Sequence, residues 1–151
     1  MKKPVFFMIC MLAFESATAD CTPVNKIIQS SNKLFKDIQG EERDSGGFVP
    51  KYILPGARED YCEIDFFENR GKNFAYYQCK WDVGGKVSAR DSAKTLIEEL
   101  ENCLGPARYK SIARDSSRAT FNLPTKLTKS KLIIKSNPGL GYVEFQIDVQ
   151  E

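Results

Sequence analysis

Apolar residues recur at helical spacing in two stretches of the chain. The first stretch opens with Thr22-Pro23, a favourable helix start, and stops before Gly40, so it predicts an amphipathic helix over 22–39. The second opens at a capping pair formed by Ser88 and Asp91 and closes at Gly105-Pro106. It predicts a second amphipathic helix whose apolar stripe runs from Ala89 to Leu104.

Alternation of apolar and polar residues predicts strands in the rest of the chain. Two alternating runs, about 60–68 and 74–83, flank Arg70-Gly71, and a two-residue turn at that point makes Cys62 face Cys79. Four more runs predict antiparallel strands over 107–113, 118–123, 129–136 and 141–149. Residues 41–60 are polar and rich in glycine and proline, so we expect a long loop there with at most one short edge strand.

These elements predict an α+β fold. Two amphipathic helices pack on an antiparallel sheet as a two-layer sandwich, in the order helix, meander, helix, meander. The two halves share this plan without matching residues, which suggests an internal repeat.

The N-terminal residues 1–19 have the three parts of a secretory signal peptide. Lys2 and Lys3 are followed by an apolar run that is too short to span a bilayer, and Ala17-Thr18-Ala19 is a small-residue cleavage site. We therefore expect cleavage after Ala19, and a single domain over 20–151 located in the bacterial periplasm or secreted. No later stretch reaches the ~20 apolar residues of a membrane helix, so we expect a chain that does not span the membrane.

Four cysteines remain after the predicted cleavage: Cys21, Cys62, Cys79 and Cys103. An even number in an oxidising compartment predicts two disulfides, with three possible connectivities. A helix that directly follows a strand usually packs back on its own sheet, which favours Cys79–Cys103 and leaves Cys21–Cys62. A bond between Cys62 and Cys79 across the predicted hairpin is the main alternative. The spacings are too long for a four-thiolate metal site, so we expect no metal and no cofactor.

The chain contains no histidine, which excludes a Ser-His-Asp triad, a Cys-His pair and a histidine general base. Glu63 and Asp65 share one face of a predicted strand and are a candidate carboxylate pair for a glycan hydrolase. That face is predicted to be solvated, which disfavours the raised pKa that a catalytic acid needs. We therefore expect a protein that is not an enzyme.

One segment is strongly basic. Residues 107–136 hold eight basic residues and one acidic residue, a net charge of +7. Strand parity places Lys129, Lys131 and Lys135 on one face, where they would attract an acidic partner. The candidate partner-binding residues combine members of this segment with two aromatic residues of the 41–60 loop: Arg108, Lys110, Lys129, Lys131, Lys135, Phe48 and Tyr52.

In outline, a small exported chain with two disulfides is similar to periplasmic inhibitors and toxin-immunity proteins. The resemblance implies a non-enzymatic binding protein that occludes an enzyme or toxin with an acidic surface. The alternative is an envelope accessory protein that binds an anionic glycan or lipid, and a hydrolase using Glu63 and Asp65 ranks last. The simplest alternative for the basic segment is a solvated, charged sheet face that binds no partner. Nucleic acid is not expected, because an exported protein seldom meets it.

Overall fold

The computed structural model describes residues 20–84, 86–105, 111–114, 118–123 and 125–151. The predicted signal peptide and its cleavage site lie outside these residues, as do Arg108 and Lys110. In the described part of the chain, eight strands form one antiparallel sheet in the order β1-β2-β3-β4-β8-β7-β6-β5. The elements are α1 (Thr22–Ser31), β1 (Gln39–Glu42), β2 (Phe48–Pro50), β3 (Cys62–Asn69), β4 (Lys72–Asp82), α2 (Lys86–Leu104), β5 (Ser111–Arg114), β6 (Arg118–Asn122), β7 (Lys129–Asn137) and β8 (Tyr142–Gln150), with short 3₁₀ helices at Lys36–Ile38 and Glu59–Tyr61.

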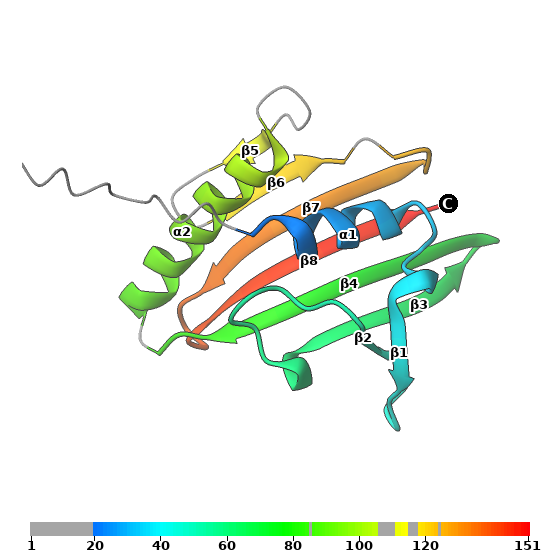
Figure 1. The fold of residues 1–151 in the computed structure, drawn as a ribbon, viewed down its shortest axis with the longest axis horizontal. Helices are drawn as coiled ribbons and strands as arrows, with labels where there is room; N and C mark the ends of the chain where they lie inside the picture. The colour runs from blue at the N-terminus through cyan, green and yellow to red at the C-terminus, as the bar shows by residue number, and fades with distance from the viewer. Residues whose placement is uncertain (1–19, 85, 106–110, 115–117, 124) are drawn as a thin grey trace, which may run out of the picture.

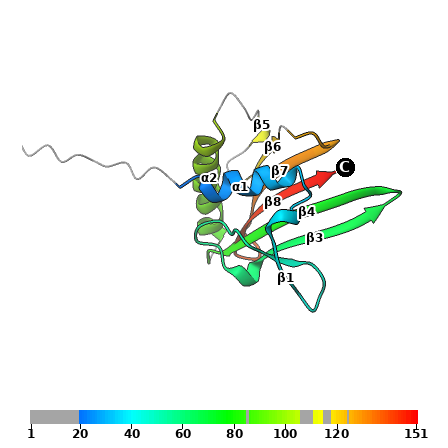
Figure 2. The same ribbon diagram turned by 45° about the vertical axis from the view of Figure 1, so that its right-hand side comes forward.

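The predicted α+β class with two disulfides is confirmed. Both helices lie on the same face of the sheet, α1 against β8 and α2 against β6, β7 and β8 (Figures 1 and 2). The core lies between the helices and the sheet, where the inward residues of the central strands meet the apolar stripes of α1 and α2. Figure 2 also shows the β3–β4 hairpin extending past the helices.

The first helix is shorter than the predicted range 22–39. It ends at Ser31, and both Leu34 and Phe35 adopt left-handed backbone conformations with φ of 54° and 60°. Leu34, Phe35 and Ile38 are nevertheless buried in the core. The apolar spacing therefore identified core residues correctly. Leu34, Phe35 and Ile38, however, lie in a turn and a 3₁₀ helix and not in α1.

The 41–60 segment differs from the predicted loop because two short strands, β1 and β2, form one edge of the sheet. Gly40 allows this pairing: a Cβ atom on Gly40 would lie 2.6 Å from the carbonyl oxygen of Val49. Pro50 ends β2, which fits the restriction of proline to edge strands and strand ends.

The predicted hairpin register is confirmed. Cys62 pairs with Cys79, and the register continues unbroken to Asn69 and Lys72. The turn residues Arg70 and Gly71 both have positive φ, as a tight two-residue hairpin turn requires.

The second half also contains the predicted helix and strands, but α2 already begins at Lys86, so Ser88 and Asp91 lie inside the helix and not at its cap. In α2, the apolar stripe from Ala89 to Leu104 faces the core, and the helix ends where the Gly105 N–H bonds to the Glu101 carbonyl. Strand β5 is the shortest of the four strands that follow, and residues 107–110 of its predicted range, 107–113, lie outside the described part.

The strand order is symmetric about the centre of the sheet. Each half of the chain supplies a helix and then four strands that run from an outer edge to the centre, where β4 and β8 pair antiparallel. The two halves therefore share one continuous sheet and one core rather than forming separate units.

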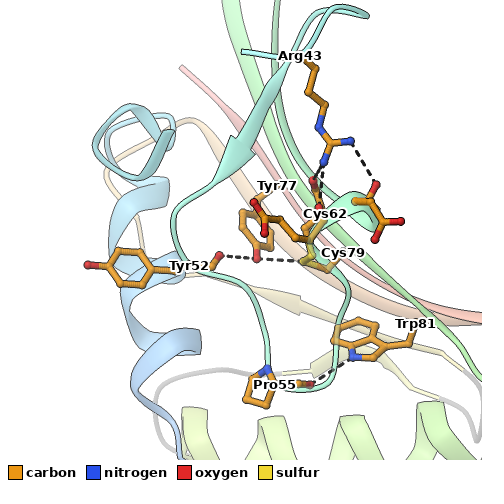
Figure 3. Close-up of a disulfide and its surroundings, with 9 residues drawn as sticks. Arg43, Tyr52, Pro55, Cys62, Tyr77, Cys79 and Trp81 are labelled. Carbon is orange, nitrogen blue, oxygen red and sulfur yellow. Dashed lines mark hydrogen bonds between the residues drawn. A yellow bond between two sulfur atoms is a disulfide. The ribbon is translucent and has the colours of Figure 1, made fainter. Parts of the chain in front are cut away.

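The preferred disulfide pairing is wrong. The structure joins Cys21 to Cys103 and Cys62 to Cys79 instead of Cys21–Cys62 and Cys79–Cys103. Cys103 lies near the C-terminal end of α2, next to the start of α1, and its Cα atom is 5.3 Å from that of Cys21. It therefore bonds to Cys21. The facing pair on β3 and β4 has a Cα–Cα distance of only 4.1 Å, and it closes across the hairpin as in the alternative considered from the register (Figure 3).

Candidate binding surface

The candidate surface is the face of the sheet opposite α1 and α2, which we call the outer face. No described helix covers it, and the side chains that alternate with the core residues of β3, β4, β8, β7 and β6 project from it. Lys129, Lys131 and Lys135 share this face on β7, as the strand parity predicts.

The three lysines differ in their surroundings. Lys135 forms an ion pair with Glu144, with 2.7 Å between Nζ and Oε1, and the Glu144 side chain is 5% exposed. Lys129 and Lys131 are exposed and form no ion pair with any described residue. Of these three lysines, the first two on β7 therefore carry a charge that no described carboxylate pairs with.

A hollow of about 480 Å³ opens beside Lys129 and Lys131. Its opposite wall is formed by Phe67 and Phe74, whose rings stack with centroids 4.9 Å apart and planes within 2°. Phe67 is 50% exposed, which is unusual for a phenylalanine. The hollow thus brings an exposed apolar wall and two cationic side chains together on one surface.

Tyr76 lies next to this wall and is held as a neutral phenol. Its hydroxyl donates to the Asp65 carboxylate at 3.2 Å. Burial, together with the negative charges of Glu63 and Asp65, raises the pKa of Tyr76 to about 12. Tyr76 therefore carries no charge at neutral pH and adds no anion to the hollow.

The candidate hydrolase carboxylates do not form the hollow. Asp65 accepts hydrogen bonds from the Phe66 backbone N–H at 2.7 Å and from Tyr76, and neither Glu63 nor Asp65 lines the hollow. Among the described residues, no three histidine, cysteine, aspartate or glutamate side chains are grouped so that they could hold a metal ion.

Phe48 and Tyr52 lie away from the outer face, which separates them from the lysines with which the sequence analysis grouped them. Phe48 packs edge-on against Phe66 on the helix side, with ring centroids 5.8 Å apart. Tyr52 lies under Lys26 of α1, whose ammonium is 4.5 Å from the ring centroid. Phe48 packs against the core, whereas Tyr52 is 37% exposed beside α1, and neither is part of the candidate surface.

The 41–60 segment is held in place by hydrogen bonds that the sequence pattern did not predict. The buried Tyr77 hydroxyl donates to the Tyr52 carbonyl at 2.8 Å (Figure 3). The Arg43 guanidinium donates to the carbonyls of Glu59, Asp60 and Cys62 at 3.0, 3.2 and 2.6 Å. These bonds fix the loop and the start of β3 next to the Cys62–Cys79 disulfide.

The aromatic wall was not predicted, although the sequence contains a signal for it. The confirmed register pairs Phe67 with Phe74, and both residues fall on the polar side of their alternating strands. An apolar pair at polar positions is the pattern that could have identified this wall.

Comparison with protein-family models, with curated proteins and with solved structures gives no match. No helix in the described residues is long and apolar enough to cross a membrane.

Proposed function

We propose that this protein is a non-enzymatic, exported binding protein, an inhibitor or immunity protein that occludes an enzyme or toxin acting in the bacterial envelope. One observation carries the proposal: exposed Lys129 and Lys131 lie beside an apolar hollow on a sheet face that no described helix covers. An exposed apolar patch that is rimmed by polar residues is a mark of an interaction site.

The proposed mechanism is steric occlusion by a rigid surface. A two-layer sandwich would present its sheet as a platform, and the two disulfides would limit its movement. A preorganised surface loses little conformational entropy on binding. The lysines would steer the platform to an acidic region of the partner and speed association.

The proposed location also fits the disulfides. Such bonds persist in the periplasm or outside the cell and are rare in the cytosol. Export would depend on the predicted signal peptide with cleavage after Ala19, and N-terminal sequencing of the protein recovered from the periplasm tests that step.

The proposal is tested by affinity capture with the oxidised protein, processed by the cell from its full chain, against envelope and secreted fractions. Three baits are compared: the wild type, Lys129→Glu/Lys131→Glu on the outer face, and Lys36→Glu/Lys94→Glu on the helix side. We expect one stoichiometric protein that binds the wild type and the helix-side variant and is lost with the outer-face variant. The activity of that protein should fall when the wild type binds it.

Two results would overturn the proposal. Capture of an anionic glycan or lipid in place of a protein would favour the envelope accessory function. A protein partner that binds all three baits equally would place the docking surface elsewhere.

A further inference from the structure

The hollow on the outer face is a compact site with two unlike walls. Strands β3 and β4 supply Phe67 and Phe74, and β7 supplies Lys129 and Lys131. Its volume of about 480 Å³ falls within the range of ordinary ligand sites, roughly 300–1,000 Å³. It is therefore large enough to hold a bulky side chain but too small for a folded element.

The aromatic wall favours an apolar group. Phe67 is half exposed and stacked flat on Phe74, so one face of the pair is covered and the edge and outer face remain open. A ring or branched aliphatic group placed against this wall would remove apolar surface of both partners from water.

The lysine wall favours a carboxylate. Asp148 lies directly across from Lys131, but its carboxylate accepts a hydrogen bond from the Gln146 amide. Two ammonium groups against one carboxylate leave the hollow with a net positive charge. An additional anion would be attracted to it.

The glutamines that line the hollow disfavour a sugar as its ligand. The Gln146 amide is already used by Asp148, and Gln150 is 8% exposed. A sugar ring needs several free hydrogen-bonding groups in its site. This hollow offers two ammonium groups and a wall of carbon, while the Asp148 carboxylate and the Tyr76 hydroxyl already have hydrogen-bond partners.

We propose that the hollow is the anchor point of the docking face and takes a bulky apolar side chain next to an Asp or Glu on a loop of the partner protein. The inference rests on the proposed function, because it specifies which groups of the partner enter the face. The apolar group packs on Phe67 and Phe74, and the carboxylate pairs with Lys129 and Lys131.

The test uses 3-phenylpropionate as a probe, since it carries a carboxylate on an apolar ring. Binding to the oxidised protein is followed through backbone amide shifts in NMR spectra. We expect shifts that cluster at the residues of the two walls. The neutral analogue 3-phenylpropanamide should bind at least about tenfold more weakly, because it cannot pair with the lysines.

Variants separate the two walls. Phe67→Ala should remove binding of the probe, and Lys129→Gln/Lys131→Gln should reduce binding of the acid to the level of the neutral analogue. Leu140→Ala is the matched control, because Leu140 is 73% exposed and does not line the hollow. That variant should bind the probe as the wild type does.

Three results would overturn the inference: shifts away from the hollow, equal binding of acid and neutral analogue, or tighter binding of tri-galacturonate, which would indicate an acidic glycan. Failure here is distinguishable from failure of the proposed function. The probe could fail to bind while Lys129→Glu/Lys131→Glu still abolishes capture of the partner. That result would support docking through the outer face and would contradict the anchor site in the hollow.

Discussion

Tyr76 and Tyr77 are neighbours on β4, and they project to opposite sides of the sheet. Tyr76 lies on the outer face and donates to Asp65, whereas Tyr77 is fully buried and donates to the Tyr52 carbonyl. Burial is the main cause of the raised pKa of both phenols. The pair thus links the candidate surface on one side to the anchored loop on the other.

Replacing Tyr77 with phenylalanine should destabilise the fold. The change removes the part-buried hydrogen bond to the Tyr52 carbonyl, and the loss of such a bond costs about 1 kcal/mol. Urea unfolding measures the loss. Tyr142→Phe is the control, because the Tyr142 ring lies under Lys80 on the outer face and we find no hydrogen bond from its hydroxyl to any described residue. Equal stability of the two variants would show that the Tyr77 bond is unimportant.

Alkaline pH should lower the stability of the protein. The folded state holds Tyr76 protonated up to a pKa of about 12, whereas an unfolded tyrosine ionises near 10. Between these values the unfolded state binds fewer protons, so the free energy of unfolding falls as pH rises from about 10 to about 12. Stability below pH 10 is unaffected by this group. Urea unfolding at several pH values checks the trend, and Tyr76→Phe should make it less steep, because the raised pKa of Tyr77 still contributes. A wild-type profile that stays level across this range would contradict the interpretation.

At the scale of elements, the edge formed by β1 and β2 depends on close backbone approach. Gly40→Ala would place a methyl group 2.6 Å from the Val49 carbonyl oxygen, so β1 must move away from β2. We expect faster hydrogen exchange at the Lys51 amide, which bonds to the Ile38 carbonyl at the same edge. Gly139→Ala is the matched control, because a Cβ atom there meets nothing within 4 Å. Unchanged exchange at Lys51 in the Gly40 variant would contradict this account of the edge.

The sequence predicted those elements whose pattern is set by local rules. The hairpin register followed from alternation and the Arg70-Gly71 turn, and the common face of Lys129 and Lys131 followed from strand parity. Long-range contacts were not predictable in this way. The ends of α1 and α2 meet only in three dimensions, so the Cys21–Cys103 bond was missed, and nothing local marks Arg43 as a donor to three carbonyls of another segment.

The candidate site was predictable in part for the same reason. Two of its lysines were identified from the charge distribution, but Phe48 and Tyr52 were included because they are aromatic residues in a polar loop. Phe48 instead packs against the core, and Tyr52 instead contacts Lys26 of α1. The hollow itself depends on how β3, β4, β8 and β7 lie side by side, and that order is set by the whole sheet.

At the scale of the whole molecule, the two disulfides should differ in what they contribute. Cys21–Cys103 spans 82 residues and Cys62–Cys79 spans 17. Loop-closure entropy then predicts a loss of about 4.5 kcal/mol for Cys21→Ala/Cys103→Ala and about 3 kcal/mol for Cys62→Ala/Cys79→Ala. Thermal and urea unfolding of the two double variants test the ranking. Peptide mapping of the oxidised wild type tests the pairing, and recovery of a Cys79–Cys103 peptide would contradict the structure.

The arrangement of the molecule assigns different tasks to the two faces of the sheet. One face carries the helices and the core, so substitutions there change stability. The other face carries exposed charge and an apolar hollow, so substitutions at Phe67, Lys129 and Lys131 should change binding with little effect on unfolding. This separation is the basis of the proposed function.

The most direct test of that claim is the association rate constant with the captured partner, measured over a range of ionic strengths. For Lys129→Glu/Lys131→Glu we predict association about tenfold slower or more at low salt, with a weaker dependence on salt, because two steering charges are reversed. Lys36→Glu/Lys94→Glu should change the rate far less. Identical rates and identical salt dependence for the two double variants would contradict docking through the outer face.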